Sequence, residues 1–190
     1  SIFMAGATIQ WIRDGLQLIN SASETATIAE DMPLDHGVFL VPAFTGLGAP
    51  YWDSNARGAI LGLTRDSGIK EIVTAALQSV GYQTKDLQKA MESDGLRPSI
   101  IRVDGGMTVN NWLLSFLANI LGATVDRPKI IETTALGVAY LAGLQAGIYS
   151  STDELAKMWH CDERFTAKID DKQRNTLYEK WLDAVKKVRS

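Results

Sequence analysis

The sequence has a single cysteine, Cys161, and two histidines among its 190 residues. One cysteine cannot form a disulfide within the chain, and a thiol without a partner fits a reducing compartment, so we expect a cytoplasmic protein. His160 and Cys161 are adjacent, and neighbouring side chains on a helix point roughly 100° apart, which argues against a Cys–His nucleophile pair. Even with His36 added, the set lacks the four ligands of a typical zinc site, so no metal is expected on these residues.

Clusters of positive charge and long apolar runs are also missing. The 19 Lys and Arg side chains are scattered among 22 Asp and Glu, for a formal net charge of −3. Nucleic-acid binding relies on clustered positive charge, so we expect no nucleic-acid partner. The longest apolar run, at 135–144, is shorter than the roughly 18–20 residues that cross a bilayer. It predicts a buried helix and no membrane partner.

What is present is enough apolar surface for a packed core. Hydrophobic residues make up 46% of the chain, and a chain of this length can bury a core of its own. The sequence begins on an apolar segment, at 1–6, without an initiator methionine and without the positive charge of a secretory signal. We therefore expect one domain, 1–190, from the C-terminal side of a longer chain.

Residue periodicity predicts the elements of this domain. Apolar residues at three- and four-residue spacing predict helices, and short β-branched or aromatic runs bounded by glycine predict strands. Expected helix caps are Ser67, Thr133 with Thr134, and Ser151 or Thr152. The expected helices are 5–20, a short one within 21–35, 69–92, 108–121, 133–146, 152–159 and 171–188, and the expected strands are 37–44, 58–63, 100–103 and 124–126. This alternation favours an α/β layered fold, with a mixed or parallel sheet flanked by helices.

The clearest candidate for a ligand site follows the strand at 100–103. That strand leads into Gly105-Gly106, and the first turn of the next helix is expected to carry Thr108 and Asn110. Glycines allow a ligand to approach the backbone, and N–H groups at a helix N-terminus favour phosphate or a polar base edge. This arrangement suits a nucleotide, although it matches neither common glycine-rich nucleotide motif. The alternative is a tight strand-to-helix turn with Thr108 as N-cap.

Two weaker candidates lie nearer the N-terminus. The segment 46–48, Gly-Leu-Gly, offers N–H groups to an anion, or else folds a loop around Tyr51 and Trp52. Gly6 and Gln10 are four residues apart and share one helix face. The Gln10 amide, next to the space left by the missing side chain of Gly6, is therefore placed to contact a ligand. The alternative for Gln10 is simple solvation.

Four longer segments resemble the C-terminal domain of the carbohydrate kinase family, and within it the glycerol kinases. They are SIFMAGATIQW at 1–11, GVFLVPAFTGLGAPYWDSNARGAILGLTR at 37–65, RVDGGMTVNNWLLSFLANILG at 102–122 and TTALGVAYLAGLQAG at 133–147. The resemblance implies the ribonuclease H-like fold of actin and the sugar kinases, with this chain as the C-terminal, nucleotide-side lobe. It also implies transfer of the γ-phosphoryl group of ATP, as its magnesium complex, to glycerol, giving sn-glycerol 3-phosphate and ADP.

The same resemblance assigns roles to four residues. Gly106 and Asn110 would contact the nucleotide, and Gly6 and Gln10 would reach it from the first helix. In the family the catalytic residue, the magnesium ligands and the glycerol contacts precede Ser1, so no catalytic residue is expected here. Implied partners are the N-terminal domain of the same chain and further copies in a homodimer or homotetramer. A kinase for xylulose, ribulose or gluconate and a non-catalytic assembly module remain alternatives.

Overall fold

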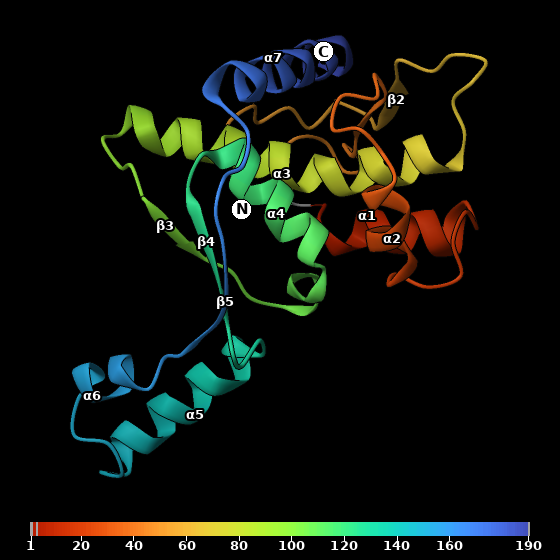
Figure 1. Cartoon of the computed structure of the whole chain (residues 1–190). Coiled ribbons are helices and arrows are strands. Elements are labelled where there is room, and N and C mark those ends of the chain that lie inside the picture. Colours follow the sequence, from red (N-terminus) through yellow and green to blue (C-terminus); the bar gives the residue numbers. More distant parts are fainter. Residues whose placement is uncertain (1, 3, 190) are drawn as a thin grey trace.

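The long helix α3 (Ile69–Ser93) crosses the middle of the molecule, with α4 (Asn111–Leu121) and α7 (Asp171–Val188) beside it (Figure 1). The structure, a computed structural model, describes residues 2 and 4–189. The other helices are α1 (Gly6–Gln10), α2 (Glu24–Glu30), α5 (Thr133–Gln145) and α6 (Thr152–Lys157), with a π-helical turn at Trp11–Gly15 and a 3-10 turn at Gly106–Val109.

The strands form two small sheets. In the first, β1 (Phe39–Val41) pairs antiparallel with β2 (Ala59–Leu61). In the second, β4 (Thr124–Pro128) lies between β3 (Ile100–Arg102), which is parallel to it, and β5 (Cys161–Phe165), which is antiparallel. The expected α/β fold with a mixed sheet and flanking helices is therefore confirmed.

Aromatic side chains fill the core between α3, α4 and α7. The ring of Tyr82 stacks on Trp181 at a centroid distance of 5.2 Å and meets Phe116 edge-on at 5.3 Å. The buried Asp86 carboxylate accepts hydrogen bonds from the Tyr178 hydroxyl (2.6 Å) and from Nε1 of Trp181 (2.9 Å). Burial raises the pKa of Asp86, because an apolar surrounding disfavours its charged form. These contacts hold α7 on α3.

A second group of apolar side chains packs α1 onto α3. Ile9 and Ile12 are buried there against Val73 and Leu77. The predicted helix over 5–20 contains this apolar stripe, but its predicted end is wrong. The helix widens into the π turn and stops at Gly15, and Gln17 adopts a positive φ of 54°, which no helix continues through.

Helix ends that depend on glycine agree with the predictions, whereas two predicted caps are wrong. Gly122 ends α4 in the left-handed conformation, with φ of 66°. The N-cap of α3 is Gly68, and the Ser67 hydroxyl instead accepts a hydrogen bond from the backbone of Thr64 (2.9 Å). Glu132 precedes α5, and the Thr133 hydroxyl donates to the carboxylate of Asp104. Ser151 caps α6 as predicted.

Strand β5 is absent from the predictions. Its sequence, Cys-Asp-Glu-Arg-Phe, is charged, and four of its five side chains are exposed or partly exposed. What makes it a strand is pairing with β4, in which Asp126 lies opposite Arg164. Such an edge strand has little apolar alternation to reveal it.

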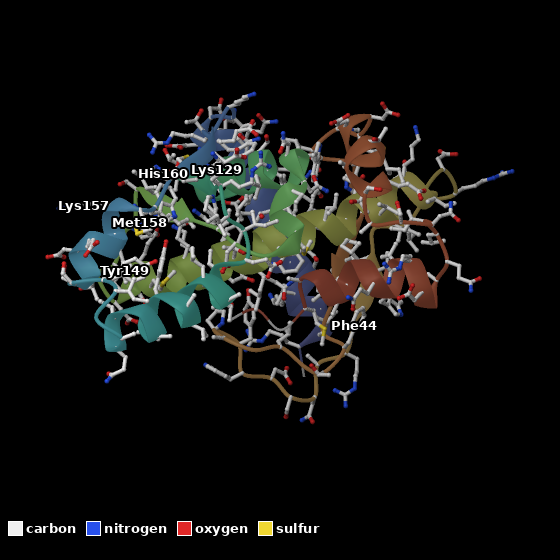
Figure 2. The ribbon with its side chains drawn as sticks, turned by 90° about the horizontal axis from the view of Figure 1, so that it is seen from below. Phe44, Lys129, Tyr149, Lys157, Met158 and His160 are labelled. Atoms are coloured by element: carbon white, nitrogen blue, oxygen red, sulfur yellow. The ribbon has the colours of Figure 1, made fainter. Side chains whose placement is uncertain are left out.

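The helix expected to be buried at 135–144 is instead exposed. In α5, Val138 and Leu141 are 65% and 68% exposed, because α5 and α6 extend from the end of the second sheet, away from α3 (Figure 1). A hollow of about 310 Å³ lies between α5 and α6. Figure 2 shows Lys129, Met158 and His160, which line it, gathered near α6 and far from Phe44. Within residues 2 and 4–189, no helix is long and apolar enough to span a membrane.

Candidate functional site

The four residues proposed for nucleotide contact lie together on one cavity of about 490 Å³. Gly6 and Gln10 reach it from α1, Gly106 from the 3-10 turn, and Asn110 from the start of α4. The remaining lining residues are Ile9, Arg13, Ala22, Ser23, Thr25, Ala26, Leu77, Met107 and Val109. Segments far apart in the sequence thus form a single site.

The turn after β3 is placed by its neighbours in the sheet. The N–H of Val103 donates to the carbonyl of Asp126 (3.2 Å), and the N–H of Gly105 donates to the carbonyl of Ile131 (3.0 Å). Gly105 has a φ of 84°, a conformation that strains any residue with a Cβ. The first glycine of the pair therefore redirects the chain out of the sheet.

The second glycine leaves open space beside the backbone. A Cβ added to Gly106 would meet no atom within 4 Å. At Gly6, which also lines the cavity, a Cβ would meet only the side chain of Met107, with Sδ at 3.7 Å. The absence of a side chain at Gly106 leaves the main-chain groups of this turn accessible from the cavity.

Asn110 has a structural role as well as a place on the cavity. Its Oδ1 accepts from the backbone N–H of Leu113 (2.9 Å), and its Nδ2 donates to the Thr25 hydroxyl (3.2 Å). Asn110 is thus the N-cap of α4 and ties that helix to α2. The expectation that Thr108 and Asn110 lie in the first helical turn, or that Thr108 is the cap, is wrong. The Thr108 hydroxyl donates to the carbonyl of Gly105 (2.7 Å) instead.

Arg13 is a cavity residue that the sequence analysis missed. It lies one turn after Gln10 on the same side of the helix, and this spacing is the signal that could have found it. Its guanidinium donates to both carboxylate oxygens of Asp14, at 2.6 and 2.8 Å, which lowers the pKa of that carboxyl. The rim of the cavity therefore carries a cation whose charge is partly balanced.

In the loop at 46–48, the N–H groups of Gly46 and Leu47 donate to main-chain carbonyls and are not offered to an anion. The N–H of Leu47 donates to the carbonyl of Asp53 (2.7 Å), and the N–H of Asp53 donates back (3.0 Å). The N–H groups of Tyr51 and Trp52 both donate to the carbonyl of Gly48, at 2.9 Å. These bonds are made within the loop itself, and the expected folding around both aromatic rings does not occur, because the Trp52 side chain is 75% exposed. Among the described residues, no group of three or more His, Cys, Asp or Glu is placed to hold a metal ion.

Comparison with known proteins decides the family. Residues 1–146 match the C-terminal domain of the FGGY family of carbohydrate kinases. The chain belongs to this family. Its relatives include a glycerol kinase of Alteromonas mediterranea, 64% identical over the whole chain, and glycerol kinase 1 of Pseudomonas aeruginosa, 60% identical. The chain spans 38% of the length of each.

Solved structures agree with this FGGY assignment. A glycerol kinase of Plasmodium falciparum, crystallised with ADP, superimposes with a TM-score of 0.88 at 36% identity, over 99% of this chain and 38% of that one. A xylulose kinase of Lactobacillus acidophilus has the same fold, with a TM-score of 0.81 at 21% identity, over 97% of this chain and 38% of its own. The actin-like ATPase fold expected from the sequence is thereby confirmed.

Proposed function

We propose that this FGGY domain, 1–190, holds the nucleotide of a glycerol kinase that transfers the γ-phosphoryl group of ATP to glycerol. The observation that carries the proposal is the convergence of Gly6, Gln10, Gly106 and Asn110 on one open cavity. Two comparisons support the proposal. Glycerol kinases are 52–64% identical to this chain over almost its whole length, and one solved glycerol kinase contains ADP.

The cavity offers three kinds of contact to a nucleotide. Gly106 leaves room for a flat ring against the backbone, and Gly6 lines the same cavity beside Met107. Gln10 and Asn110 carry amides that form hydrogen bonds with base or ribose, since the bond from Asn110 to Thr25 takes only one of its two Nδ2 protons. Arg13 contributes positive charge near the phosphates. All of these are binding contacts, and in phosphoryl transfer positioning and charge neutralisation account for most of the catalysis.

Magnesium and glycerol belong to the remainder of the enzyme in this proposal. Magnesium would neutralise charge on the phosphates, and the described residues offer it no ligand cluster. The catalytic and glycerol-binding residues would lie on a partner domain, consistent with a chain that spans 38% of its relatives. We further propose that the complete enzyme is a cytoplasmic homodimer or homotetramer, as the resemblance to glycerol kinases implies.

Neither alternative is favoured. Xylulose and gluconate kinases match at 21% identity, which shows the shared fold alone. A non-catalytic assembly module gives no reason for two glycine-lined segments to meet at an open cavity.

The test is a calorimetric titration of the chain with ADP. We expect saturable binding, which Gly106→Val weakens by about tenfold or more because its branched side chain enters the cavity. Asn110→Asp keeps the helix cap but replaces the amide donor with a negative charge, so it should also weaken binding. Gly137→Val is the matched control, since Gly137 on α5 likewise has open space around it. No binding at millimolar ADP, or equal weakening by the control, would refute the proposal.

A further inference from the structure

Arg127 of β4 joins the sheet to the turn that lines the nucleotide cavity. Its side chain is 14% exposed. On one side, Nη1 donates to the carbonyl of Thr108 (3.1 Å) and to Oδ1 of Asn111 (2.6 Å). On the other side, Nε donates to Asp162 (2.9 Å) and Nη2 to Glu163 (2.7 Å), both on β5. A single guanidinium therefore connects the sheet with the 3-10 turn and with the first residue of α4.

This guanidinium lies behind the cavity wall. Arg127 is not among the residues that line the 490 Å³ cavity. It lines a neighbouring hollow, and Val109 borders both spaces. Ala26 of α2 borders both spaces as well, but the hydrogen bonds of Arg127 toward the cavity wall go to Thr108 in the turn and to Asn111 at the start of α4.

The turn is supported from outside as well as by its own hydrogen bonds. Within it, the N–H and the hydroxyl of Thr108 both donate to the carbonyl of Gly105, at 3.0 and 2.7 Å, and the N–H of Asn110 donates to the carbonyl of Met107 (3.1 Å). The hydrogen bonds of a 3-10 turn have poor geometry, and such turns are short for that reason. The N–H and hydroxyl of Thr108 are thus bonded inside the turn, whereas its carbonyl is held from outside by Arg127.

Arginine suits this task better than lysine. Its planar fork presents five donors in fixed directions, so it can reach acceptors on two elements at once. Asp162 and Glu163 hold the fork in place and balance its charge. A lysine ammonium at the same position keeps the charge but cannot span both sides.

We infer that Arg127, held by Asp162 and Glu163, is a positioning residue for nucleotide binding, which fixes Gly106 and Asn110 at the cavity without touching the ligand. The inference rests on the proposed function. Its physical basis is that the apparent dissociation constant equals the intrinsic one divided by the fraction of molecules with a binding-competent turn. If losing Arg127 leaves the turn in place about one tenth of the time, affinity falls about tenfold.

The experiment compares the unmodified chain with Arg127→Met in two measurements. Calorimetry gives the dissociation constant for ADP, and hydrogen exchange without nucleotide gives the protection of the backbone amides of Thr108 and Asn110. We expect a dissociation constant about tenfold higher in Arg127→Met. We also expect faster exchange at these two amides and unchanged protection inside α4, for example at Phe116.

Two further variants separate positioning from general stability. Arg174→Met is the matched control, because Arg174 is 13% exposed, donates to the carbonyls of Asn119 (2.6 Å) and Ile169 (3.3 Å), and pairs with Asp171 at the opposite end of α4. It should leave ADP affinity unchanged. Arg127→Lys should restore little of the affinity. Asn111→Ala keeps both ion pairs of Arg127 and should raise the dissociation constant severalfold even if Arg127→Met does not fold.

The outcomes are distinguishable. Failure of the unmodified chain to bind ADP overturns the proposed function and this inference with it. Binding by the unmodified chain with an unchanged dissociation constant in Arg127→Met and Asn111→Ala overturns the inference alone. So does a loss of affinity in Arg174→Met equal to that in Arg127→Met, or a loss of protection spread evenly over α4. Local loss of protection at the turn together with weaker ADP binding supports the inference.

Discussion

Gly81 of α3 faces the ring of Phe116 of α4 so closely that a Cβ on Gly81 would lie 2.7 Å from Cε1 of the ring. Phe116 is 1% exposed and is held between Tyr82 and Trp112, whose ring centroids are 5.3 and 5.5 Å away. The ring is therefore packed on two sides by other aromatic rings. The missing side chain at Gly81 lets α3 and α4 pack closely, and so helps to fix where α4 begins at the cavity.

Alanine at two helical glycines should change stability in opposite directions. Gly81→Ala should destabilise the fold by about 1–3 kcal/mol, because overpacking against Phe116 outweighs the better helix propensity of alanine. Gly137→Ala should stabilise it by about 0.5–1 kcal/mol, because Gly137 in α5 has nothing within 4 Å of a Cβ. Urea denaturation measures both. Effects of the same sign would contradict this account.

The two glycines after β3 should also differ. Gly105→Ala should cost roughly 1–2 kcal/mol of stability, because the φ of 84° strains an L side chain. Gly106→Ala should leave the midpoint of urea denaturation nearly unchanged, because its Cβ meets no atom, yet it should reduce ADP affinity. Denaturation together with an ADP titration checks the pair, and equal losses of stability would show that the turn is strained throughout.

Stability should fall on mild acidification because of His36. Burial lowers the pKa of this imidazole, whose Nε2 lies 3.2 Å from Oε1 of Gln78. The folded-state pKa is thus below the unfolded value of about 6.5. The stability that the neutral His36 imidazole contributes is fully present above about pH 6.5, and it is lost as the pH falls through the folded-state pKa of His36. The free energy of unfolding of His36→Gln, measured from pH 7.5 to 5, should have a shallower slope than that of the parent chain. Identical slopes would exclude His36 as the cause.

Removing the buried carboxylate of Asp86 should loosen α7. In Asp86→Ala the Tyr178 hydroxyl and the Trp181 Nε1 lose their acceptor, at about 1–3 kcal/mol for each donor left unsatisfied. Tyr178→Phe removes one donor and keeps the acceptor, so it should cost only about 1 kcal/mol. Thermal unfolding of both variants tests the ranking, and the reverse order would show that Asp86 does not anchor α7.

Features that depend on neighbouring residues could be predicted from the sequence. The glycine at 122 ends α4 and the serine at 151 caps α6, because these ends are set by backbone conformation and by hydrogen bonds a few residues long. The bounds of α7, Asp171–Val188, were also predicted. Strand β5 and the exposed position of α5 were not, because they depend on pairing and packing with distant segments.

In the candidate site, too, some features could be predicted from the sequence and others could not. The sequence by itself determined the residue types, with Gly105-Gly106 after a strand and Gly6 four residues from Gln10, and its resemblance to kinases supplied the hypothesis of a shared ligand. Only the tertiary structure decided that the two segments face one cavity, and that Asn110 rather than Thr108 caps α4. The reason is that α1, α2 and α4 meet by burying apolar side chains against α3, and burial between distant segments leaves no local signature in the sequence.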